Sequence, residues 1–129
     1  MEIALRAALI DWLASDPLLA DQLNAVVEEA PARTSLPWLA ISASASIDWS
    51  SKTHRGREVR IALELQSRGD QPSAAADLVS AIEQRIESLP HNQAGFTIVT
   101  LHFLRARAEQ RGESQRAILI EYRFHVIAN

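Results

Sequence analysis

The chain of 129 residues contains no cysteine, and this absence removes several kinds of chemistry. Disulfide bonds, thiolate zinc sites and thiol nucleophiles are excluded, which fits a reducing compartment. Glycine is also scarce, with four residues in all, and neither a GxGxxG nor a GxxxxGK run occurs. The sequence therefore lacks the phosphate-binding loops that such glycines build.

Long apolar runs are missing as well. Residues 4–10 form the most apolar stretch near the start, but Arg6 interrupts them and Asp11 follows them. This stretch is therefore predicted to be neither a signal peptide nor a membrane span. With 47% hydrophobic residues, the chain fits a single domain over residues 1–129, which buries roughly two thirds of its unfolded surface. We expect a soluble, intracellular protein with no membrane partner.

The spacing of apolar residues predicts helices and strands in the order αββαββ. The helical stripe marks residues 2–14 and 73–89, with a short helical piece over residues 18–23 that Asp16 caps and Pro17 begins. Strands are predicted over residues 39–49, 59–66, 96–107 and 116–127, and a brief extended run is compatible with residues 26–27. This order predicts an α+β fold, with a mostly antiparallel four-stranded sheet and helices packed on one face.

Strict alternation marks the first two strands as a hairpin. The residues of one parity, expected on the buried face, are Leu39, Ile41, Ala43, Ala45, Ile47 and Trp49. In the third strand the apolar parity changes between Ile98 and Val99, which indicates either a bulge or burial of both faces.

The tip of this long, projecting hairpin gathers positive charge. Between residues 52 and 60, four basic residues and one acidic residue give a charge of +3, whereas residues 1–48 carry −5 and the whole chain −3. Opposite charges on two parts of a molecule steer copies into head-to-tail contact, which generates a ring or a filament. The alternative is that these charges only protect an exposed sheet edge.

Two sets of residues are predicted to contact other subunits or proteins. The first set is Trp49, Lys52, His54, Arg55, Arg57, Glu58 and Arg60. The second set, a possible second basic rim, is Arg105, Arg107, Arg111 and Arg116. Trp49 can alternatively extend the core stripe, because large aromatic residues are usually buried. The two sets form one cationic end only if both hairpin tips project the same way.

No catalytic, metal or cofactor site is predicted. His102 and His125 lie on strands expected to pair, but two imidazoles without a third ligand rarely hold a metal. Glu28 and Glu29 are adjacent and point apart, so they are a poor acid and base pair. The serines at positions 42, 44 and 46 lack the G-x-S-x-G turn of a nucleophile and more plausibly allow another layer to approach.

Several short motifs, in order along the chain, resemble those of a known family. They are residues 1–6 of the first helix, Leu36-Pro37-Trp38, Asp48-Trp49-Ser50-Ser51-Lys52-Thr53, Gly56-Arg57-Glu58, Ser67-Arg68-Gly69, an Ala-rich helix ending near Leu89-Pro90, and the strand around residues 101–104. The chain resembles the tail-completion, or tail-terminator, proteins of long-tailed bacteriophages and gene transfer agents. It departs from them at Gln66, where an aromatic residue is often seen.

The resemblance implies a structural protein and not an enzyme. Such proteins form a ring, typically hexameric, on the head-proximal end of the tail tube. The ring stops tube polymerisation and joins the tail to the head connector, and DNA passes through its lumen without sequence-specific binding. The implied partners are further copies of the chain, the tail tube protein and the connector or stopper protein, with assembly in the host cytoplasm and a final place in the virion.

Two other functions stay open from the residues alone. A nucleic-acid-binding module can use the basic hairpin together with the arginines of residues 105–116. A hydrolase or metal enzyme can use His102 and His125. Salt dependence of DNA affinity tests the first, and metal analysis tests the second.

Overall fold

The computed structural model describes residues 1–129. Its helical segments are α1 (Glu2–Ala14), α2 (Pro17–Gln22), the 3-10 turn η1 (Pro72–Ala75) and α3 (Ala76–Glu87). Its strands are β1 (Ala25–Val27), β2 (Trp38–Asp48), β3 (Gly56–Arg68), β4 (Phe96–Gln110) and β5 (Gln115–Ala128). None of the helices combines the length and the apolar character needed to cross a membrane.

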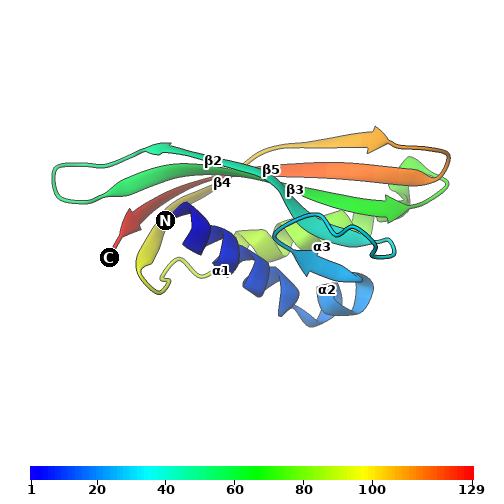
Figure 1. The fold of residues 1–129 in the computed structure, drawn as a ribbon, viewed down its shortest axis with the longest axis horizontal. Helices are drawn as coiled ribbons and strands as arrows, with labels where there is room; N and C mark the ends of the chain where they lie inside the picture. Colours follow the sequence, from blue (N-terminus) through cyan, green and yellow to red (C-terminus); the bar gives the residue numbers. More distant parts are fainter.

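All strands belong to one sheet, in the order β1-β2-β3-β5-β4 (Figure 1). The pairings β2–β3, β3–β5 and β5–β4 are antiparallel, whereas β1 runs parallel to β2. The predicted α+β class and mostly antiparallel sheet are confirmed. The expected strand count of four was too low, because residues 25–27 add a short fifth strand, too short to show its own alternation.

Local signals explain where the helices begin and end. The Asp16 carboxylate accepts a hydrogen bond from the Leu19 N–H at 3.1 Å, and Pro17 occupies the first turn of α2, as predicted. The helix predicted over residues 73–89 is shorter than expected. It begins as the 3-10 turn η1 and leaves the α conformation at Ser88, two residues before Pro90.

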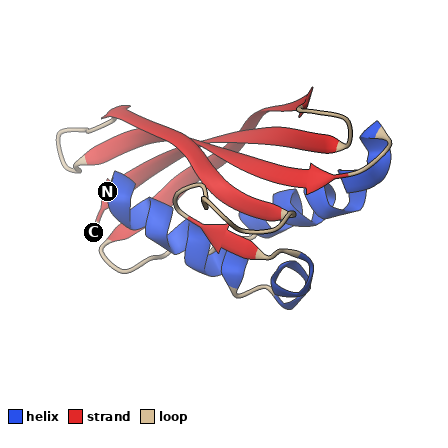
Figure 2. Ribbon diagram, turned by 45° about the vertical axis from the view of Figure 1, so that its right-hand side comes forward, coloured by secondary structure: helices blue, strands red, loops and turns tan.

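The helices cover one face of the sheet, and the hydrophobic core lies between the two layers (Figure 2). From the helices, Leu5, Leu9 and Leu13 of α1 and Ile82 and Ile86 of α3 are buried in this core. They meet an inward-facing set from the strands that comprises Leu39, Ile41, Val59, Ile61, Leu63, Leu65, Ile120, Tyr122, Phe124 and Val126. The other face of the sheet carries no helix.

Two polar contacts hold α3 to its neighbours at the edge of the core. The Arg85 guanidinium lies 3.4 Å over the Trp12 ring, and its Nε donates to the Trp12 carbonyl oxygen at 2.9 Å. The buried Tyr122 hydroxyl donates to Glu87 Oε2 at 2.6 Å. Burial and this hydrogen bond raise the pKa of Tyr122 well above its ordinary value, so the hydroxyl remains a donor.

A bulge at Ser42 corrects the predicted face of β2. The register with β3 shifts between Ile41 and Ala43, so the strand inserts one extra residue there. Because alternate residues point to opposite faces, one extra residue moves everything after it to the other face. Leu39 and Ile41 are buried as predicted, but Ala43, Ala45 and Ile47 are exposed on the open face.

The break in parity on β4 is also a bulge. The register with β5 shifts between Ile98 and Thr100, at the position where the apolar residues change face. Of the two alternatives that the sequence left open near Ile98 and Val99, the structure has the bulge. A second shift between Phe103 and Arg105 was not predicted.

The loop between β2 and β3 lies at one extreme of the molecule and projects past the N-terminal end of α1 (Figure 1). The β3 strand pairs with β5 along its whole length, from Gly56 with Ile127 to Arg68 with Gln115. The β2–β3 loop is therefore beside the end of β5, and the β4–β5 loop is beside the end of β3. The two hairpin tips lie at opposite ends of the sheet.

Candidate functional site

Residues 49–55 form the basic loop at the first hairpin tip, and serine side chains give it a defined shape. Ser51 Oγ accepts hydrogen bonds from the N–H groups of Thr53 and His54, at 3.3 Å and 3.2 Å. The Ser51 N–H in turn donates to the His54 carbonyl oxygen at 2.9 Å. Lys52 and Arg55 are exposed on this frame and make no ion pair within the molecule. Their charge is available to a partner.

Gly56 closes the base of this loop. The Trp49 N–H donates to the Gly56 carbonyl oxygen at 2.9 Å, and the Gly56 N–H donates to Ser50 Oγ at 3.0 Å. A Cβ atom at Gly56 would collide with the Trp49 carbonyl oxygen. The sequence therefore needs glycine here because the two strands approach closely, and not for a positive φ angle.

Trp49 and Glu58 lie in a side-chain cluster at the base of the loop. The indole of Trp49 stacks on the imidazole of His125, with ring centroids 4.3 Å apart and planes 6° from parallel. His125 Nε2 lies 2.9 Å from Glu58 Oε1, and Nδ1 lies 2.7 Å from Thr100 Oγ1. Trp49 is 39% exposed, so it is not the core residue that its parity allowed.

This cluster changes the acid–base behaviour of Glu58. The hydrogen bond and charge of His125, helped by Arg60 and Arg123, hold the pKa of Glu58 below its usual range despite partial burial. Glu58 and Trp49 therefore join the hairpin base to β5, and they fix the direction in which the basic loop points.

On the helix side of the same hairpin, serines contact the first turn of α1. Arg6 donates to Ser44 Oγ at 2.8 Å, and Ser44 Oγ donates to Glu2 Oε2 at 2.7 Å. Hydrogen bonds from Ser44 and Ser46, with the charges of Arg6 and Arg57, hold the pKa of Glu2 below its usual range. Arg57 also donates to Ser46 Oγ at 3.0 Å, so part of its hydrogen-bonding capacity is used inside the subunit.

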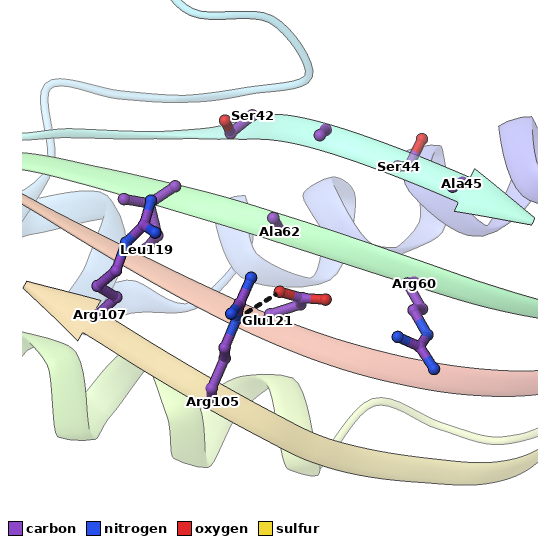
Figure 3. Close-up of a pocket in the computed structure, with 10 residues that line it drawn as sticks. Ser42, Ser44, Ala45, Arg60, Ala62, Arg105, Arg107, Leu119 and Glu121 are labelled. Carbon is purple, nitrogen blue, oxygen red and sulfur yellow. Dashed lines mark hydrogen bonds and ion pairs between the residues drawn. The ribbon is translucent and has the colours of Figure 1, made fainter.

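The open face of the sheet carries three arginines around a floor of small residues (Figure 3). Arg60, Arg105 and Arg107 come from β3 and β4, and Ala43, Ala45 and Ala62 supply much of the floor of a shallow hollow of about 330 Å³. Arg105 Nε lies 3.0 Å from Glu121 Oε2, and Arg107 lies 3.0 Å from Glu109. The arginine side chains of both pairs are exposed, so solvent screens these contacts.

The second predicted set of arginines is divided between this face and the far loop. Arg105 and Arg107 lie on the open face with Arg60, whereas Arg111 pairs with Glu109 and Glu64 at 3.0 Å and 3.4 Å. These carboxylates, Glu109 first, raise the pKa of Arg111. Arg116 Nε donates to the Gly69 carbonyl oxygen at 3.1 Å. Since the two tips lie at opposite ends, the two sets do not form one cationic end.

Three of the histidines have different surroundings. His102 is opposite Arg123 on the open face, and His125 is engaged by Glu58 and Thr100. His54 is within the basic loop, where Nδ1 lies 3.0 Å from Thr53 Oγ1. The structure contains no group of three histidine, aspartate or glutamate side chains with the arrangement of a metal site.

Sequence reasoning missed the Trp49–His125 stack and the contact between Ser44 and α1. The sequence suggested only that His125 lies near His102, because both are on the outward parity of strands expected to pair. No feature of the neighbouring residues indicates that the Trp49 ring, from another strand, stacks on His125. The alternating serines did indicate the contact with α1, because small residues were expected to allow another layer to approach. The bulge at Ser42 was not foreseen, so the sequence did not show on which face of the sheet these serines lie.

Comparison with known proteins gives two kinds of match. The family model described as "Tail completion protein gp17" matches residues 7–127. A chain from the solved virion of a native gene transfer agent particle is 22% identical, covers 96% of this chain and 95% of its own, and has a TM-score of 0.77. A second solved chain, 12% identical, covers 98% and 92% with a TM-score of 0.51. At these identities both structures show the fold alone. No curated protein matches the sequence.

Proposed function

This chain belongs to the family of the tail completion protein gp17, and we propose that it forms a ring on the head-proximal end of a virion tail tube. The ring stops tube polymerisation and joins the tail to the head connector. It is hexameric, and DNA passes through its lumen without sequence-specific binding. The role is structural, with no catalytic step and no cofactor.

The family match over residues 7–127 is the observation that carries this proposal. It covers almost the whole folded unit, including both hairpins and the helices beneath them. A matching fold in a gene transfer agent virion supports a place in the particle itself, reached after assembly in the host cytoplasm. The coarse conclusion, a structural part in tail assembly, follows from the family.

The geometry supplies the contact surface for this role. Lys52, His54 and Arg55 project from the far end of the sheet, and the Trp49–His125–Glu58 cluster holds their loop in place. Residues 1–48 carry a charge of −5, so the tip of one copy and the body of another attract each other. We assign the tip to contacts with the adjacent subunit or the tube below. Arg57 and Arg60 lie at the base of the tip and belong to the same contact surface.

Electron microscopy of particles made without this protein tests the proposal. Tails of uncontrolled length, or tails detached from heads, are expected when the ring is missing. Normal tails joined to heads in the same preparation would contradict the assigned role. The purified chain alone, and mixed with tube protein, should give a ring by sedimentation and native mass measurement.

Nucleic-acid contact is a second candidate function, and the open face favours it. Arg60, Arg105 and Arg107 line an open, shallow hollow there without a covering helix, and several cations on one open face can contact successive phosphates. Its signature is a steep loss of DNA affinity with rising salt, which charge removal at these arginines reduces. A DNA affinity that does not change with salt concentration would exclude nucleic-acid contact through these arginines.

A further inference from the structure

The two outermost strands of the sheet leave long unpaired edges. On one side β4 is the last strand and spans 15 residues. On the other side, β1 covers β2 only from Trp38 to Ala40, so the outer edge of β2 is unpaired over residues 41–48. Free edges present backbone N–H and C=O groups that can pair with a further strand.

The existing hydrogen bonds show which backbone groups point outward. In an antiparallel ladder, residues alternate between facing their partner strand and facing away from it. The Trp49 N–H donates to Gly56, so counting back along β2 directs the N–H groups of Ser44 and Ser46 to the free edge. The Arg111 N–H donates to Gln115, and the same count on β4 directs the N–H of Ala106 outward.

Most of the large apolar side chains exposed on the molecule lie on these edges. Of six such residues, Ile47 and the adjoining Trp49 belong to the β2 edge, and Val99 and Phe103 belong to β4. Ile47 is 62% exposed, and Val99 and Phe103 about 42% and 41%. Single exposed apolar residues are ordinary, but their concentration on both unpaired edges is typical of an interface.

Charge and size are complementary between the two edges. Counted across the ladder, Arg105 is level with Ala43 and Arg107 with Ala40. Beside that part of β2 lie the carboxylates of residues 28 and 29, which line one hollow with residues 40–42. Glu28 also pairs with Arg6 of its own copy at 3.5 Å, whereas Glu29 is exposed and has no ion pair. Ala40 is the last residue of β2 that β1 covers. A neighbouring β4 would therefore bring Arg105 over the small Ala43 and Arg107 to the end of β1, toward these acids.

The strand directions also fit. Three antiparallel steps separate β2 from β4, so the two strands run in opposite directions. A second copy added at the same level therefore continues the antiparallel alternation across the contact. We propose that β4 of one copy pairs with residues 41–48 of β2 of the next copy, as the head-to-tail contact of the ring. This inference rests on the proposed function and names its subunit interface.

Engineered cysteines can test the pairing, because the chain has no cysteine of its own that could form other disulfides. Ala45 is level with His102 through Arg60 and Arg123. Within one copy they are three strand spacings apart, roughly 14 Å, which is too far for a disulfide. The double variant Ala45→Cys with His102→Cys should therefore form covalent chains of three or more copies on mild oxidation.

The single variants are the matched controls. A head-to-tail contact places unlike edges together, so neither Ala45→Cys nor His102→Cys alone should cross-link. Covalent dimers of a single variant would show like edges meeting and would overturn the proposal. A short bismaleimide, and the pair Ala45→Cys with Thr100→Cys, keep the test valid if the strands are offset by one pair of residues.

A proline on the free edge gives an independent measurement. Ala106→Pro removes one outward N–H and no hydrogen bond within the subunit, so it should weaken ring assembly by about tenfold. Ala106→Thr keeps the N–H and should assemble normally, and circular dichroism checks that both variants fold. If Ala106→Pro does not fold, the charged edge variant Phe103→Lys takes its place.

The outcomes separate this inference from the proposed function. Rings that assemble normally with Ala106→Pro, and whose double cysteine variant stays uncross-linked, overturn the edge pairing and leave the ring intact. A wild-type chain that forms no oligomer, with or without tube protein, overturns both. Covalent chains from the double variant alone, with weakened Ala106→Pro rings, support the pairing.

Discussion

The two faces of the sheet use the same strands for different purposes. On the helix-covered face, β3 and β5 bury an unbroken series of aliphatic and aromatic side chains against α1 and α3. One residue along each strand, the open face carries arginine, glutamate, histidine and alanine with no helix above them. The difference teaches that stability and assembly are encoded at alternate positions, so substitutions on the two faces should separate them.

The largest expected effect breaks the covered face. Ile82→Ala or Ile120→Ala removes side chain from a fully buried position and should lower the free energy of unfolding by about 2–5 kcal/mol. Ile47→Ala, exposed at the edge, is the matched control and should cost less than about 0.5 kcal/mol. Urea denaturation measures both. Equal losses at Ile82 and Ile47 would show that the faces do not differ in this way.

A smaller effect is expected where the covered face holds a polar group. Tyr122→Phe keeps the buried ring but leaves Glu87 without its donor, so unfolding free energy should fall by about 1 kcal/mol. The Phe103→Leu variant, which changes a half-exposed ring that contacts Tyr122, serves as the comparison. A thermal melt unchanged by Tyr122→Phe would mean that solvent replaces this bond without cost.

A pH titration compares the two faces further, because a carboxylate of lowered pKa lies on each face of the hairpin. In the folded protein the pKa values of Glu58, on the open face, and Glu2, in α1, are lower than the ordinary value of 4.5. Their contributions are therefore present above that value and are lost as the pH falls through the lowered folded values. Glu58→Gln or Glu2→Gln should therefore flatten the decline in stability as the pH falls below that ordinary value. An acid limb as steep as wild type in both variants would contradict the assignment.

The smallest effect on stability is expected at the hairpin tip. Lys52→Glu with Arg55→Glu reverses two exposed charges that have no internal partner, so unfolding free energy should change by less than about 0.5 kcal/mol. Assembly with further copies or tube protein should weaken, as sedimentation would show. Arg57→Glu is a useful contrast, because it also removes a hydrogen bond to Ser46 and places a carboxylate near Glu2. Lower stability with unchanged assembly in the tip variant would reverse our interpretation.

Much of the fold was predictable because its signals are local. The Asp16 cap, the stripe of Leu5 and Leu9 in the first helix, and the alternation from Val59 to Leu65 each lie within a short stretch of chain. An irregularity on β4 was visible too, since the apolar parity changes at Val99, although the sequence left burial of both faces as an alternative to the bulge. The bulge at Ser42 was not, because alanine and serine are small enough to lie on either face.

The candidate site was predictable in part for a similar reason. The basic composition of residues 52–60 is visible in the sequence, whereas its orientation depends on Trp49, Glu58 and His125, which come from three places in the chain. The gathering of Arg60 with Arg105 and Arg107 likewise needed the strand order, since β5 lies between them.

The amino-acid sequence by itself determined the order of the longer helices and strands, the mostly antiparallel sheet, the helix-covered core and the positive charge of one hairpin tip. Each of these depends on residues close together in the chain, where propensity, capping and periodicity act. Only the tertiary structure decided that the two hairpin tips lie at opposite ends, that Ser42 turns the following alanines outward, and that both long edges stay unpaired. Those features depend on register between distant strands, and a shift of one residue, invisible in composition, sends every later side chain to the opposite face.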